Sequence, residues 1–314
     1  MNLYAVGFVI AVTLGAFALS LTLVPGEQEY ALIQLRSKQY GKALESYVAM
    51  WQAGDRSVSV LIPLTQLYLQ HGEVNRAAEA MQQFVAKNPD HLEARRQLGL
   101  YYQYAQRPSD YVQNLQAISR LDASEAVLRE LSDSYNLYGQ YDRQIEVLHR
   151  LVRLYPEDPQ DFLHLTHLQA AERRFDAALA TLDLRARHHP DAMNDEIVEI
   201  YVQLAFAAQQ PQRALRVVES WLSADSNPSS VAPLVSLFHR HGEPALAWKL
   251  LEPYDARIDD EPALLAEFAR VRYDLGDAEG AWARLARLDA ARRLPRAVIP
   301  EAIQLALVLV GDEC

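Results

Sequence analysis

Apolar residues recur at helical spacing along this chain, and one small residue returns about every 34 positions. Successive copies are 34, 34, 33, 34, 36, 33 and 34 residues apart. Four and seven residues after a copy stand large apolar residues, such as Met81 and Phe84, which form one stripe of a helix. A fixed period of this size predicts stacked helical units. The eight equivalent positions are Ala43, Ala77, Tyr111, Gln144, Ala178, Ala214, Ala247 and Ala281.

Other residues keep a fixed phase within each unit. Nine positions before the small residue stands a bulky one, such as Tyr68 or Phe238, and proline closes several units, as at Pro89. Five positions before the small residue, four units have glycine, which takes the left-handed conformation that ends a helix. Each unit therefore reads as helix, tight turn, helix. The four glycines are Gly72, Gly139, Gly242 and Gly276.

This arrangement resembles the tetratricopeptide repeat (TPR) family, whose unit is a helical hairpin of 34 residues. Clear copies are LTQLYLQHGEVNRAAEAMQQFVAKNP and LSDSYNLYGQYDRQIEVLHRLVRLYP. The resemblance covers residues 27–295 and implies an all-α fold, a TPR-type α-solenoid of about eight hairpins. Two units depart from the pattern, because Tyr111 and Gln144 replace the small residue. The unit that begins at Asp195 is the weakest, so we expect a distorted join near Asn194 and another near Asn227.

The amino-terminal segment, residues 1–26, is predicted to be a transmembrane helix. Residues 3–24 contain no charged side chain, and about 20 apolar residues cross a bilayer. No basic residue precedes Arg36 and no good cleavage site is present, which favours an anchor over a cleaved signal peptide. A buried apolar helix is the remaining alternative. Because the amino terminus is the only positive group on the short side, the charge bias slightly favours repeats outside the cytoplasm.

The carboxy-terminal segment, residues 296–314, is predicted to form a last apolar helix after the eighth unit. Its apolar stretch is too short to span a membrane. A terminal helix should be polar on its outer face, yet this one has apolar residues all round. We expect it to dock on a partner or a second copy of the chain; the alternative is that a bent helix buries both faces on the eighth unit. The docking residues are Ile303, Leu305 and Leu309.

Composition and motifs narrow the function classes. The net charge of −11 argues against a nucleic-acid scaffold, which needs a basic stripe. No phosphate-binding loop, nucleophile motif or C-x-x-C occurs, and the single cysteine, Cys314, cannot form an internal disulfide. His164 and His167 have the spacing to share a metal, but no third ligand is evident, so we interpret them as surface residues. We therefore expect a non-enzymatic protein without cofactor or metal.

The resemblance also implies a partner-binding groove, because in TPR proteins the first helix of each unit faces the inner surface. The residues at the corresponding positions mix charges, amides and tyrosines, which suits an extended peptide; the alternative is that they are merely solvated. The family's clamp for terminal carboxylates does not fit, because Asp133 would repel such a group. The groove residues are Arg96, Tyr104, Arg129, Asp133, Asn136, His167, Gln203, His239, Arg270 and Tyr273.

The combination of one span and a repeat domain resembles membrane-anchored bacterial envelope assembly and secretion scaffolds. That resemblance implies a single-pass inner-membrane protein with periplasmic repeats, which holds one protein partner for another in an envelope complex. The alternative is a TPR component of an exopolysaccharide synthesis or export machine that guides glycan or tethers synthase and export proteins. Rows of aromatic residues on the groove would favour this alternative. A hydrolase is disfavoured, because no residues remain outside the repeats to form a catalytic domain.

Overall fold

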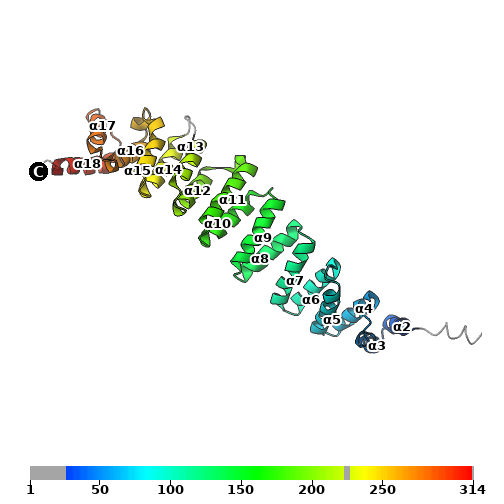
Figure 1. Ribbon diagram of the computed structural model, residues 1–314. Helices are drawn as coiled ribbons and strands as arrows, with labels where there is room; N and C mark the ends of the chain where they lie inside the picture. Colours follow the sequence, from blue (N-terminus) through cyan, green and yellow to red (C-terminus); the bar gives the residue numbers. More distant parts are fainter. Residues whose placement is uncertain (1–25, 223–226, 313–314) are drawn as a thin grey trace, which may run out of the picture. The chain divides into compact units, whose positions relative to one another are not determined.

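The computed structural model describes residues 26–222 and 227–312, and these residues form helices and turns without any strand (Figure 1). The predicted all-α repeat fold is confirmed for this part of the chain. The protein divides into two compact units, residues 1–147 and 148–314. The boundary lies within helix α9 (Tyr141–Leu154).

Unit 1 is built from helical hairpins whose two helices pack against each other and against the next hairpin. One cluster of its buried core runs from Ala31 to Tyr102, and further residues such as Leu115 and Tyr135 are buried beyond it. The helices are α2 (Glu27–Arg36), α3 (Tyr40–Gln52), α4 (Val58–Gln70), α5 (Val74–Lys87), α6 (Leu92–Tyr104), α7 (Pro108–Leu121), α8 (Glu125–Leu137) and the start of α9.

Unit 2 continues the same pattern from the second half of α9. One cluster of its core runs from Ala178 to Leu305, and Phe162 and Leu165 before it are also buried. The first helices of successive hairpins touch one another, α12 with α14, α14 with α16 and α16 with α18. The helices are α10 (Pro159–Ala171), α11 (Phe175–His188), α12 (Asp195–Ala207), α13 (Pro211–Trp221), α14 (Pro228–Arg240), α15 (Pro244–Leu251), α16 (Pro262–Asp274), α17 (Ala278–Ala290) and α18 (Ile299–Asp312).

The small position of each unit lies where the two helices of a hairpin come closest. All six alanines at this position are fully buried, and so is Gln144. Tyr111 is half-buried and fits because the facing residue on α6 is Gly99. A Cβ atom on Gly99 would lie 3.6 Å from the Tyr111 ring and 3.4 Å from the Asn114 amide. Gln144 faces a small polar residue, Ser132, and donates a hydrogen bond to its hydroxyl (3.5 Å). The two departures from the pattern are therefore compensated on the first helix.

The turn between the two helices has a left-handed residue in all eight hairpins. The predicted glycines adopt φ angles from 63° to 83°. The other four hairpins have non-glycine residues there, with φ angles from 53° to 59°. In this conformation a Cβ atom approaches the following carbonyl oxygen, which costs about 1–2 kcal/mol. The backbone geometry is thus fixed by the repeat and not by glycine. The four non-glycine residues are Lys38, Gln106, Arg173 and Gln209.

The join before α12 is irregular, as expected near Asn194. A 3-10 turn, Pro190–Ala192, separates α11 from α12, and the Asn194 side chain accepts a hydrogen bond from the Ile197 amide. Arg185 on α11 is buried and donates a hydrogen bond to the Ala192 carbonyl (3.0 Å). Burial lowers the pKa of the Arg185 guanidinium.

The predicted single-pass inner-membrane location is contradicted. From Glu27 onward, none of the described helices is long and apolar enough to cross a bilayer. The predicted span itself, residues 3–24, lies outside the described residues. The apolar stripes that are described turn inward onto neighbouring helices, so they form the core of the repeats.

We predict that alanine substitution has opposite effects at two glycines of unit 1. Gly72 has φ of 74°, and a Cβ atom added to it would have no other atom within 4 Å, so Gly72→Ala costs only backbone strain, about 1 kcal/mol. Gly41 lies in α3 with equally open surroundings and no positive φ. Gly41→Ala should therefore stabilise by up to about 0.5 kcal/mol. Urea unfolding of both variants measures the difference, and a stabilising Gly72→Ala would contradict the left-handed turn.

Candidate functional site

In unit 1 the predicted groove residues stand on two first helices, α6 and α8. We define the exposed side chains of α2, α4, α6 and α8 as the first-helix face of this unit. Tyr104 is 67% exposed, and Asp133 and Asn136 are exposed as well. Arg96 forms an ion pair with Asp122 (2.8 Å), and Arg129 forms one with Glu125 (3.0 Å). Both arginines thus already have partners in the chain.

In unit 2 the first-helix face is formed by α10, α12, α14 and α16, together with α18. His167 and Gln203 are exposed on it. The other three predicted residues, His239, Arg270 and Tyr273, line one pocket of about 230 Å³. Three of the ten predicted groove residues therefore lie together at one described site.

This pocket contains a chain of charged contacts across α14, α16 and α18. His239 Nε2 lies 2.6 Å from Asp274 Oδ2, and its Nδ1 lies 3.9 Å from Glu267 Oε2. Arg270 donates to Glu267 Oε1 (2.8 Å) and to Glu301 Oε1 (2.5 Å). Burial lowers the pKa of Arg270, but the hydrogen bond to Glu301 and the attraction of Glu267 outweigh it and raise the pKa. Arg270 is thus a permanent cation that ties α16 to α18.

The sequence prediction missed the three carboxylates of this site. Glu267, Arg270 and Asp274 are spaced three and four residues apart, which places them on one side of α16. Glu301 stands 34 residues after Glu267, so the two glutamates occupy the same phase of consecutive first helices. The repeat period could have placed them side by side. Glutamates are seldom buried, however, and charged residues on a helix are ordinarily interpreted as solvated.

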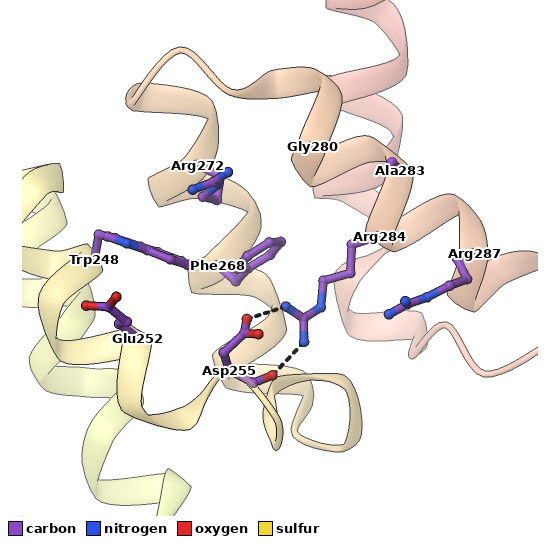
Figure 2. A pocket seen from close by; sticks show the side chains of 9 residues that line it. All are labelled: Trp248, Glu252, Asp255, Phe268, Arg272, Gly280, Ala283, Arg284 and Arg287. Carbon is purple, nitrogen blue, oxygen red and sulfur yellow. Dashed lines mark hydrogen bonds and ion pairs between the residues drawn. The ribbon is translucent and has the colours of Figure 1, made fainter.

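A second, larger hollow lies between α15, α16 and α17 (Figure 2). This open trough of about 740 Å³ has Trp248 and Phe268 on its floor, with guanidinium groups 4.9 Å and 4.8 Å from their ring centres. Arg284, the group over Phe268, donates to Asp255 (2.5 Å) and Asp259 (2.5 Å). Burial lowers the pKa of Arg284, but these two hydrogen bonds outweigh it and raise the pKa.

The ion pairs of the trough have a structural role. Helix α15 ends after eight residues, and two short 3-10 turns, Glu252–Tyr254 and Ile258–Asp260, follow it. Arg284 and Arg287 on α17 bind the aspartates of these turns. We interpret the trough as the consequence of this shortened helix, held in place by arginines that already face carboxylates.

The predicted docking helix at the carboxy terminus is α18. Leu305 is only 2% exposed and belongs to the core of unit 2, so it is not part of the exposed face of α18. Ile303 is 55% exposed, and Leu309 is half-buried. The exposed stripe of α18 instead consists of Ile299, Ile303 and Leu307, four residues apart. Docking through this helix remains a prediction.

Comparisons with known proteins match solved structures at low sequence identity. No protein-family model matches the chain, and no curated protein sequence matches it either. A chain of the Naa15/Naa10 complex bound to HypK-THB is 15% identical, with a TM-score of 0.48 over 78% of this chain and 39% of that one. The chain thus spans about two-fifths of that protein. MamA is 13% identical (TM-score 0.31, 59% and 93% covered), and a mutant form of MamA is 19% identical (TM-score 0.33, 54% and 93% covered).

We predict that glutamate substitutions at two positions of α18 have different effects on stability, because one side chain packs on the eighth hairpin and the other is exposed. Leu305→Glu would bury an uncompensated charge in the core of unit 2 and should destabilise it by about 3–5 kcal/mol. Ile303→Glu, two residues away and exposed, should change stability by about 0.5 kcal/mol or less. Thermal unfolding followed by circular dichroism measures both. Equal melting temperatures for the two variants would contradict the packing of α18 on the eighth hairpin.

Proposed function

We propose that this chain is a non-enzymatic scaffold that binds an extended segment of another protein through its first-helix face. The observation that carries the proposal is the recurrence of polar and aromatic side chains, most of them exposed, at a few repeat positions of the first helices in each unit. In these repeats the apolar stripes of both helices pack against neighbouring helices, and the polar side of each first helix faces solvent. The groove residues chosen from the sequence are the proposed contacts in both units.

Tyr104 is the strongest single contact in this proposal. It is the last residue of α6 and two-thirds of its surface is exposed. Tyrosine is enriched among residues that dominate binding energy, since its ring buries a large area at low entropic cost. Asp133 and Asn136 on α8 supply polar groups on the same face of unit 1. One aromatic anchor beside polar side chains is typical of peptide recognition.

A glycan-guiding role, as in exopolysaccharide export, is less well supported. Such a surface would have aromatic residues in rows, whereas the ten groove positions contain two tyrosines, one in each unit. The other eight are charged, amide or histidine side chains. The resemblance to bacterial envelope scaffolds adds a narrower proposal, that the bound protein belongs to an envelope assembly complex. Identification of the captured partner tests this directly.

We predict that a variant of the unit 1 face, Tyr104→Ala with Asp133→Arg, loses most of the partner. The full-length chain is expressed in its source cells, and co-purified proteins are quantified by mass spectrometry. We expect recovery of one specific protein to fall at least about tenfold, because a single aromatic contact can be worth about 2 kcal/mol or more. Stability should be unchanged, since both side chains are exposed.

The matched control is Tyr141→Ala with Glu79→Arg, which likewise changes one tyrosine and one acidic residue, on the second helices α9 and α5 of unit 1. Both of these side chains are exposed. This variant should recover the partner as well as the wild type does. If both variants lose the protein equally, or neither does, the first-helix face is not its binding surface.

A further inference from the structure

Glu301 lines the pocket on α14, α16 and α18, and Glu267 contacts two other lining residues, His239 and Arg270. Both carboxylates are buried, and each uses only one of its two oxygens. Glu267 and Glu301 are 5% and 9% exposed, and Oε1 of each accepts a hydrogen bond from Arg270. The second oxygen of each, Oε2, is buried and accepts no hydrogen bond. A buried ionised oxygen without a donor is unfavourable, because it has lost water and gained nothing in exchange.

The chain itself does not supply the missing donors. His239 Nδ1 lies 3.9 Å from Glu267 Oε2, beyond hydrogen-bonding distance. His239 directs its other nitrogen to Asp274 at the rim of the pocket. With Arg270 as the permanent cation, the three carboxylates leave two negative charges in excess when the imidazole is neutral. The pocket is therefore electrostatically suited to an added cation.

The volume of the pocket and the residues that line it indicate which kind of cation would fit. Its volume of about 230 Å³ is below the range of about 300–1,000 Å³ that is typical of cofactor and drug-sized ligands. It corresponds to about eight water molecules of liquid volume, which suits one long side chain. Ala269 and Leu305 line it together with Tyr273, so an aliphatic stem would find apolar surface. Among the described residues, no group of histidine, cysteine, aspartate and glutamate is arranged to hold a metal ion.

We propose that this pocket binds the cationic side chain of a lysine or arginine in the partner protein. The stem lies along Leu305 and Tyr273, and the charged head reaches Glu301, with Asp274 at the rim. The net charge of −11 attracts a basic segment from a distance. That the cation belongs to a partner protein rests on the proposed scaffold function. The pocket's preference for a cation follows from its own residues.

The test uses side-chain analogues and the full-length protein with labelled methyl groups. n-Butylguanidinium and n-butylammonium stand for arginine and lysine, and n-butanol and butyrate are the neutral and anionic controls. We expect saturable shifts of the Leu305 and Ala269 methyl signals with at least one of the two cations. The controls should bind at least about tenfold more weakly, because they cannot form the charge-assisted hydrogen bond. Equal shifts with n-butanol would overturn the proposal.

Glu301→Gln keeps the shape of the side chain and removes its charge, so it should weaken binding of the cations about tenfold. Should this variant fail to fold, Asp274→Asn at the rim replaces it. Glu252→Gln, an exposed carboxylate in the trough, is the control and should bind like the wild type. Unchanged affinity in both pocket variants would overturn the proposal.

The same variants distinguish the two proposals when the captured partner is quantified. Loss of analogue binding together with loss of partner in Glu301→Gln supports a basic partner residue in the pocket. Unchanged partner recovery despite lost analogue binding contradicts it and leaves the scaffold function standing. The scaffold function is tested independently by the unit 1 variants, which do not change any residue of this pocket.

Discussion

The close approach of two helices at one position in each hairpin is the constraint on which this structure depends. Wherever that position is alanine, the side chain is fully buried, and the helices are free to meet over a methyl group. Where it is Tyr111, the space comes from Gly99 on the facing helix. The left-handed turn follows from the same geometry, since a second helix that must return at this distance leaves one conformation for the turn. Four hairpins adopt it without glycine.

The fold could largely be predicted from the sequence, because small residues, turn glycines and apolar stripes all repeat with one period. The irregular features carried weaker signals. The end of α15 after eight residues is stabilised by Arg284, whose aspartate partners precede it by 29 and 25 residues. No local pattern indicates such pairs. The membrane prediction rested on residues 3–24 alone, which lie outside the described residues, and no described helix supports it.

The candidate site could be predicted only in part. The repeat phase placed His239, Arg270 and Tyr273 on one face, and they do share a pocket. Glu267 and Glu301 were not anticipated, because their burial depends on Arg270 bridging two consecutive hairpins. Leu305, in contrast, was expected on the surface and is buried. Helical periodicity gives the side of the helix on which a residue lies. On the last helix it does not tell which side packs against the preceding hairpin.

The two hollows of unit 2 differ in how fully their charged side chains are paired within the chain. This difference distinguishes charges with a structural role from candidate binding groups. In the trough, Arg284 meets two carboxylates and a carbonyl, so its charge holds the irregular segment after α15. In the first-helix pocket, one guanidinium serves two glutamates and leaves an oxygen on each without a donor. Buried charges are stabilising only when they are paired and hydrogen-bonded. An incomplete network on an otherwise well-packed face is where a partner gains most by binding.

The most direct test of the repeat register is overpacking of a single small position. Ala178 is fully buried on α11, and Ala180 is exposed two residues further along the same helix. Ala178→Leu should lower the free energy of unfolding by about 1–3 kcal/mol, because the helices cannot separate without losing contacts. Ala180→Leu should change it by about 0.5 kcal/mol or less. Equal stability of the two variants, measured by denaturant unfolding, would contradict the register on which the assignment of the first-helix face depends.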